Sequence, residues 1–231
     1  RSRPASQRPS RSYSPHPLTH GGHRSQITPN AAPDIVDELV DVAPGSFIDE
    51  LRRRRPVTRE QTQRAYDALF SPVDDGEVSI AERWIIAAFA TRLAAAADAG
   101  GADVDGHYAT QAYAADPQRA SVALAEAAAA ATEGPYGDYA ESGLQGENAA
   151  GERYSAQAVR DALGARLAAA LEHAHLLVFR PREASAQALD ALLEAGWSIE
   201  GIVTISQLIA FLSYQQRVVA GLRVLAEEAA A

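Results

Sequence analysis

The sequence predicts an all-α fold, a helical bundle that follows a disordered N-terminal tail. Three observations support this prediction. Apolar residues recur at helical spacing from Asp34 onward, helix-capping residues precede most of these segments, and no convincing alternating strand pattern occurs. Of the 231 residues, 47% are hydrophobic, which is enough for one sizeable core. We therefore expect a single all-α domain over residues 34–231.

Capping and breaking residues set the limits of the expected helices. The expected ranges are 34–42, 47–54, 58–71, 79–99, 106–115, 117–132, 155–179, 186–195 and 198–225. Proline in the first turn supports the start at residue 117. Residues 133–154 form a glycine-containing loop of 22 residues, a length that fits either a functional loop or a flexible surface excursion.

Residues 1–33 have a different composition from the rest of the chain. They are rich in Arg, Ser, Pro, His and Gly, contain no acidic residue and show no apolar period. Such a segment cannot bury enough apolar surface to offset the entropy of ordering, so we expect a disordered tail. The tail has no apolar signal-peptide core, and no stretch of the chain has the length and apolarity of a membrane span. A cytoplasmic protein without a membrane partner is expected.

Charge and cysteine content exclude several functions. The formal net charge of −9 argues against nucleic-acid partners, since these need basic surface to replace counterions around phosphates. The chain contains no cysteine, which excludes disulfides and thiolate metal ligands. No phosphate-binding glycine loop, Ser-His-Asp order or His-Glu-x-x-His motif occurs. Neither a metal nor another cofactor is expected, and the His173–His175 pair points in two directions on its helix.

Two parts of the chain resemble segments of one known protein superfamily. Residues 79–114, SIAERWIIAAFATRLAAAADAGGADVDGHYATQAYA, contain Glu82 and Arg83 where that family has an acid–arginine pair, and His107 where it has a histidine. Residues 171–225, together with the GPYG segment at 134–137, are similar to a cysteine-less subgroup of carboxymuconolactone decarboxylase domain proteins. Together the segments resemble the alkylhydroperoxidase and carboxymuconolactone decarboxylase superfamily, and the resemblance implies an alkylhydroperoxidase D-like helical bundle.

The sequence departs from the peroxidase members at the reactive dithiol. Counting back from His107, the positions of their Cys-x-x-Cys are taken by Gly100 and Asp103, and Glu82 and His107 are 25 residues apart, which suggests an insertion. Thiolate chemistry needs a thiol, so we expect no peroxide-reducing turnover with a dithiol donor. The resemblance then implies a peroxidase-related protein that acts, if at all, by proton transfer or decarboxylation on a small acidic metabolite.

The resemblance also implies which residues surround a substrate cavity. Glu82 and His107 would be the catalytic proton-transfer groups, and Arg217, Arg83 and Tyr136 would bind substrate. Structural roles fit the same residues: Ser79 and Glu82 match a capping box, and His107 can simply begin a helix. Arg217 lies among apolar residues, where it needs either a carboxylate partner such as Glu82 or an anionic ligand.

A further hypothesis is that the chain is a catalytically inactive subunit of a larger assembly. Superfamily members commonly form homo-oligomers, so the chain would assemble with itself or with an active peroxidase-like paralog. The residues expected to supply the partner face are Ile205, Leu208, Ile209 and Leu212. Tyr139 and Tyr214 could line the same cavity as Tyr136, although tyrosines at such positions also serve as packing residues.

Overall fold

Helix α4, Ile80–Ala97, lies at the centre of the structure, a computed structural model that describes residues 34–97 and 102–230. Its residues 85–91 are buried without interruption, which covers every face of the helix over about two turns. Helices α5, α6, α8 and α10 pack around it. The described residues belong to one compact unit, Ala32–Ala231. The predicted tail at 1–33 and the predicted helix end at Gly100 lie outside the described residues.

The described residues form ten α-helices and three short 3-10 helices, with no strand. The α-helices are α1 (Ile35–Val40), α2 (Phe47–Arg53), α3 (Pro56–Phe70), α4 (Ile80–Ala97), α5 (Ala102–Ala115), α6 (Pro117–Ala130), α7 (Arg160–Leu163), α8 (Ala165–Phe179), α9 (Ala186–Glu194) and α10 (Ile199–Ala230). The 3-10 helices are η1 (Gln145–Glu147), η2 (Gln157–Val159) and η3 (Pro181–Glu183). The all-α prediction is therefore confirmed for the described part of the chain.

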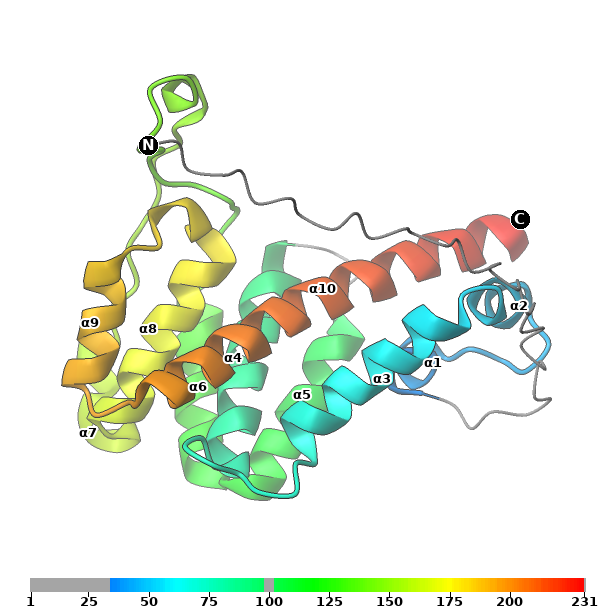
Figure 1. Ribbon diagram of the computed structural model, residues 1–231, viewed down its shortest axis with the longest axis horizontal. Coiled ribbons are helices and arrows are strands. Elements are labelled where there is room, and N and C mark those ends of the chain that lie inside the picture. The colour runs from blue at the N-terminus through cyan, green and yellow to red at the C-terminus, as the bar shows by residue number, and fades with distance from the viewer. Residues whose placement is uncertain (1–33, 98–101, 231) are drawn as a thin grey trace, which may run out of the picture. The chain divides into compact units, whose positions relative to one another are not determined.

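The long helix α10 connects two groups of helices. Its N-terminal part packs beside α8 and α9, and its C-terminal part lies beside α1, α2 and α3 (Figure 1). Ile205, Leu208, Ile209 and Leu212 are at most 1% exposed, because they face the core between these helices. The expectation that these four residues supply a partner face is therefore wrong.

The first three helices are joined by a buried ion-pair network. Asp34 caps α1 and forms a capping box with Asp37. Arg52 from α2 donates to both carboxylates, at 2.5 Å to Asp34 and 2.5 Å to Asp37, and Arg59 from α3 binds the same two residues. All four side chains are at most 14% exposed, so removal of one partner would leave an uncompensated buried charge.

Several helix boundaries differ from the sequence prediction, including the start of α5 at Ala102 instead of Gly106 and the end of α10 at Ala230 instead of Leu225. Helix α3 begins at Pro56, with Arg55 as its N-cap residue, rather than after Thr58, because proline is preorganised for the first helical turn. The single helix expected over 155–179 is interrupted at Gly164, whose φ of +83° is incompatible with a continuous helix and is rarely adopted by other residues. Apolar spacing alone does not reveal this break.

Length and apolarity decide whether one of the described helices could span a membrane. No single one is both long and apolar enough to cross a bilayer. One pair, Ala186–Glu194 with Ile199–Ala229, meets the length and composition criteria together, but the two helices meet at an angle of 118°.

Two buried histidines make the stability of this fold depend on pH. Burial lowers the pKa of His173 and of His175 to about 4. His175 contacts the Tyr154 and Phe179 rings, and its pKa is lowered further by Arg180 and raised by a backbone hydrogen bond at Ala130. Between pH 4 and the unfolded-state pKa of about 6.5, the unfolded chain binds more protons than the folded chain.

We therefore predict that stability is full above about pH 6.5 and falls as the pH is lowered toward 4, by up to about 3 kcal/mol per histidine. Urea unfolding at a series of pH values measures this dependence. In His175→Gln, the stability should change less steeply with pH over this window than in wild type, whatever the offset in absolute stability. Equal slopes for the two proteins would contradict the prediction.

Candidate functional site

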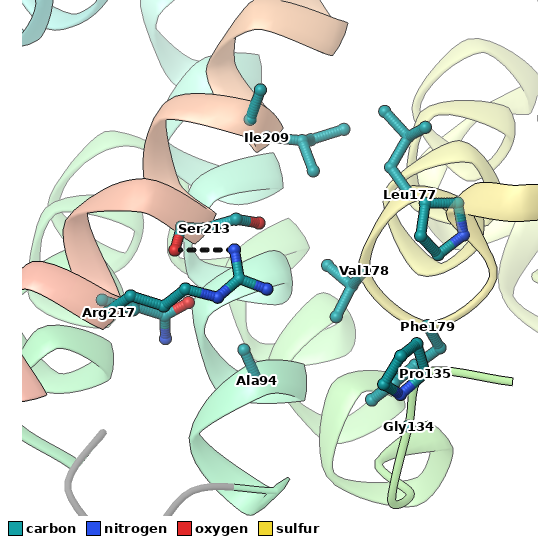
Figure 2. A pocket seen from close by; sticks show the side chains of 12 residues that line it. Ala94, Gly134, Pro135, Leu177, Val178, Phe179, Ile209, Ser213 and Arg217 are labelled. Atoms are coloured by element: carbon teal, nitrogen blue, oxygen red, sulfur yellow. Dashed lines mark hydrogen bonds between the residues drawn. The ribbon is translucent and has the colours of Figure 1, made fainter.

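A cavity of about 550 Å³ lies where α4, α8 and α10 meet, and we call it the α8–α10 cavity. Its walls are mostly apolar. Figure 2 shows Leu177 and Val178 from α8 on one side and Ile209 from α10 on the other, with Ala94 of α4 between them. A concave, largely apolar space of this size with few polar groups is typical of small-molecule sites.

Arg217 is the only charged residue among the described residues that line the α8–α10 cavity. Its guanidinium extends from α10 across the cavity toward Val178 (Figure 2). Its Nη1 donates to the carbonyl oxygen of Ser213 over 3.4 Å, a long hydrogen bond. Arg217 is exposed, so the burial that the sequence suggested does not occur, and no described carboxylate forms an ion pair with it. Most of its donors therefore face solvent, where a ligand can reach them.

The GPYG segment, residues 134–137, forms one wall of the cavity. Gly134 and Pro135 line it, and Gly134 lies so close to Phe179 that an added Cβ would be 2.7 Å from the Phe179 ring. Gly137 has φ +111°, a conformation that favours glycine. Close packing and backbone geometry therefore explain both glycines.

Tyr136 anchors this wall rather than lining the cavity. It is 3% exposed, its ring stacks on Phe179, and its hydroxyl donates to the carbonyl oxygen of Glu152 at 2.6 Å. Burial raises the pKa of the Tyr136 hydroxyl. An added Cβ at Gly151 would meet the Tyr136 ring at 2.0 Å, so the loop closes tightly over the ring. The expected substrate-binding role of Tyr136 is replaced by a structural one in this arrangement.

Glu82 lies at the N-terminus of α4 and has structural partners. Its Oε2 accepts hydrogen bonds from the Ser79 amide at 2.9 Å and the Ser79 hydroxyl at 2.8 Å, which is the capping box that the sequence also allows. Its Oε1 accepts from Arg166 Nε at 3.1 Å. The partner of Glu82 is thus Arg166 of α8, and the pairing with Arg217 considered from the sequence is not formed.

Arg166 completes a junction of four segments around Glu82. Its guanidinium also donates to the carbonyl oxygens of Glu77 and Gly196, and it stacks 3.7 Å from the Trp197 ring centroid. Trp197 Nε1 donates back to the Arg166 carbonyl oxygen at 2.7 Å. The chemistry of this junction is charge compensation and helix capping.

His107 lies in an aromatic cluster away from Glu82. Its Nε2 is 3.1 Å from the Tyr66 hydroxyl, and its ring packs against Trp84 and Tyr108. Burial lowers the pKa of His107, while Glu38 acts in the opposite direction. It lines a separate cavity of about 350 Å³ near Glu38. The histidine is therefore neutral near pH 7 and has a protein hydrogen-bond partner.

The hydrogen-bond donors of Arg83 are occupied by backbone carbonyl oxygens. The side chain is 5% exposed, and its three nitrogens donate to the carbonyl oxygens of Val78, Leu69 and Asp75 at 2.9, 2.7 and 2.7 Å. Burial lowers the pKa of Arg83, although Asp75 opposes this effect. The guanidinium fork closes the connection between α3 and α4, and it does not line the α8–α10 cavity.

The residues expected at one site are thus distributed over several places. Glu82 is at the Arg166 junction, His107 faces Tyr66, and Arg217 is at the α8–α10 cavity. Tyr139 stacks under Arg182, and the Tyr214 hydroxyl pairs with Thr62 at 3.0 Å. Only Arg217 keeps the geometry of a ligand-binding group. The position expected for the first cysteine, Gly100, is outside the described residues, and the Asp103 side chain is likewise not described.

Sequence reasoning missed Arg166 and Arg180. Both are arginines at or beside the apolar helix α8. Arg166 reaches Glu82 of α4, and Arg180 pairs with Glu183, three residues along the chain. The signal that singled out Arg217, an arginine within an apolar run, is also present at these two positions.

Comparisons with models of known protein families, with curated proteins and with solved structures found no match to this chain. The family relation inferred from the segments around Glu82 and Arg217 therefore stays a prediction. Assignment of the site rests on its geometry.

The carbonyl contacts of Arg83 predict a structural phenotype. Arg83→Ala would strip three carbonyl oxygens of their donor and should destabilise the fold by about 3 kcal/mol, measured by urea unfolding. Arg83→Lys should recover only part of this loss, because an ammonium cannot reproduce the planar fork. The matched control is Arg64→Ala, whose exposed i,i+4 pair with Glu60 contributes little. An Arg83→Ala protein as stable as the control would contradict the structural assignment.

Proposed function

We propose that the chain binds a small amphipathic carboxylate in the α8–α10 cavity, with Arg217 holding the carboxylate. The observation that carries this proposal is an arginine without a described carboxylate partner, extended over an apolar cavity of about 550 Å³. The proposed ligand agrees with the small acidic metabolite that the sequence resemblance implies. The apolar walls of the cavity add the requirement that the ligand has an apolar body.

The proposed orientation follows from the cavity walls. A carboxylate has the planar, two-oxygen geometry that matches a guanidinium fork. Leu177, Val178 and Ile209 would enclose the apolar part of the ligand, and its burial would supply most of the binding free energy. A ligand with the same body and no charge would lose the contact with Arg217.

The arrangement supports binding rather than turnover. Proton transfer or decarboxylation needs an acid–base group at the reacting atoms. Glu82 and His107 do not line the α8–α10 cavity, and its remaining polar groups are Ser213 and Gln216. Gln216 is engaged, because its Nε2 donates to the Thr91 carbonyl oxygen at 2.9 Å. The proposal for this cavity is therefore binding, because proton transfer or decarboxylation would need an acid–base group that its described lining does not supply.

The relation to carboxymuconolactone decarboxylase-like proteins is part of the same proposal. It is supported by the all-α fold and by the packing of α4 along α10, the two helices that carry the resembling segments. A cytoplasmic protein that lacks the redox dithiol remains the expectation for the whole chain.

A second candidate function is a non-catalytic subunit of a homo-oligomer or of a complex with a peroxidase-like paralog. Two exposed apolar pairs favour it. Leu189 and Leu193 on α9 are 41% and 43% exposed, and Ile199 and Val203 on α10 are 69% and 49% exposed. These pairs are each four residues apart, so each lies on one helix face. Light scattering across a range of protein concentrations tests self-association, and a monomer throughout would contradict the homo-oligomer.

Calorimetric titration with decanoate and with decanol tests the ligand proposal. We predict that decanoate binds more tightly than decanol, and that Arg217→Gln weakens decanoate binding by about tenfold while leaving decanol binding nearly unchanged. The charge-assisted contact exists only for the carboxylate, which is the reason for the difference.

Two further variants test whether the ligands bind in the α8–α10 cavity. Ala210→Phe places a bulky ring at the cavity wall and should weaken both ligands. Arg64→Gln, on an exposed part of α3, removes the same charge elsewhere and should affect neither. Equal decanoate affinities for wild type and Arg217→Gln would reject the proposed function.

A further inference from the structure

A second cavity, of about 530 Å³, lies beside the face of α8 that packs on α9, and we call it the α8–α9 cavity. His173, Leu176 and Arg180 line it at helical spacing, while Leu177 and Val178 line the α8–α10 cavity. Helix α8 therefore separates two cavities of different chemistry. In contrast to the first, this cavity has charged residues on several sides.

Arginines reach the α8–α9 cavity from three segments. Arg153 comes from the loop before η2, Arg160 begins α7, and Arg180 follows the last residue of α8. These three arginines meet at one cavity although the net charge of the chain is −9. Multiple guanidinium groups at one cavity are the donor set that recognises oxyanions.

Arg180 is buried and incompletely hydrogen-bonded. It is 8% exposed, and its Nε has no hydrogen-bond partner among the described residues. Its Nη2 forms an ion pair with Glu183 Oε2 at 3.4 Å, and Arg153 Nη2 forms one with the same oxygen at 2.8 Å, although neither contact has hydrogen-bond geometry. Glu183 thus compensates the charge of Arg180, but the buried Nε still lacks the acceptor that a buried donor needs.

His173 provides a second unsatisfied group at the same cavity. The side chain is 6% exposed, its Nε2 is 3.0 Å from the Ser206 hydroxyl, and its Nδ1 has no partner in the described part of the chain. Arg180 and His173 thus both line this cavity, and each is more than nine-tenths buried and has a buried polar atom without a described partner. Two such groups together indicate a polar occupant.

Carboxylates complete the lining and restrict the body of the occupant. Glu172 Oε1 accepts hydrogen bonds from the Ala156 amide at 2.8 Å and the Ser155 hydroxyl at 3.3 Å, and Glu194 lines the cavity from α9. Carboxylates accept hydrogen bonds and repel a second negative group. The occupant therefore needs an anionic end near the arginines and donor groups near the glutamates.

We propose that the α8–α9 cavity is a binding site for a small polar oxyanion, a phosphate ester or a carboxylate, held by Arg180 with Arg160 and His173. The body of this ligand carries hydroxyl or amino donors that face Glu172 and Glu194. The site is independent of the α8–α10 cavity, because it lies against another face of α8 and selects a polar ligand rather than an apolar one.

The test is a calorimetric titration of the full chain with inorganic phosphate and, separately, with acetate. Saturable binding of at least one probe is expected, and the tighter probe identifies the anionic group of the ligand. Arg180→Lys should weaken that probe by about tenfold, because the ammonium loses the fork geometry. Arg160 is exposed, so Arg160→Gln serves as a variant that does not threaten folding and should weaken the probe by about threefold.

Controls separate this site from general charge effects and from the proposed carboxylate cavity. Arg119→Gln removes an exposed arginine that pairs with Asp116 and should leave probe affinity unchanged. Arg160→Gln should also leave decanoate affinity unchanged. Absence of saturable binding with both probes, or equal affinities for wild type and Arg160→Gln, would overturn the proposal even if decanoate binds as expected.

Discussion

The structure depends on one constraint, which is that α4 is apolar on every side and must be surrounded. Its residues 85–91 are buried in succession, so no face is left for solvent. A single neighbouring helix cannot satisfy such a segment. Helices α5, α6, α8 and α10 do so together, and their packing around α4 fixes the spacing between α8 and α10 at which the first cavity occurs.

The polar chemistry is located where helices end or change direction around this core. Arg83 binds the carbonyl oxygens at the turn between α3 and α4, and Arg166 connects the start of α4 with the turn between α9 and α10. Unpaired carbonyl groups accumulate at helix C-termini, and a guanidinium can satisfy several of them at once. In this chain, which has no lysine, arginine performs that role repeatedly.

Local sequence signals predicted the elements better than the site. Asp34, Ser46, Asp116 and Ser185 cap the helices expected to follow them, because a cap is a contact over three residues. Gly164 was missed, since apolar spacing continues across it and only its φ of +83° reveals the break. The contact between Glu82 and Arg166 spans 84 residues, and such a pairing depends on tertiary packing that helical periodicity does not encode.

The extent to which each guanidinium is hydrogen-bonded separates the structural arginines from those proposed to bind ligands. Arg83 and Arg166 both lie beside apolar helices, yet their donors are occupied by backbone carbonyls or by Glu82, and neither lines one of the two proposed binding cavities. Arg217 is exposed at its cavity and Arg180 is buried at the other, where it pairs with Glu183, and both keep donors without described acceptors. Arginine in an apolar context is therefore an incomplete signal, because burial demands an acceptor but does not say whether the protein or a ligand supplies it. The number of donors that the fold leaves unused decides between the two.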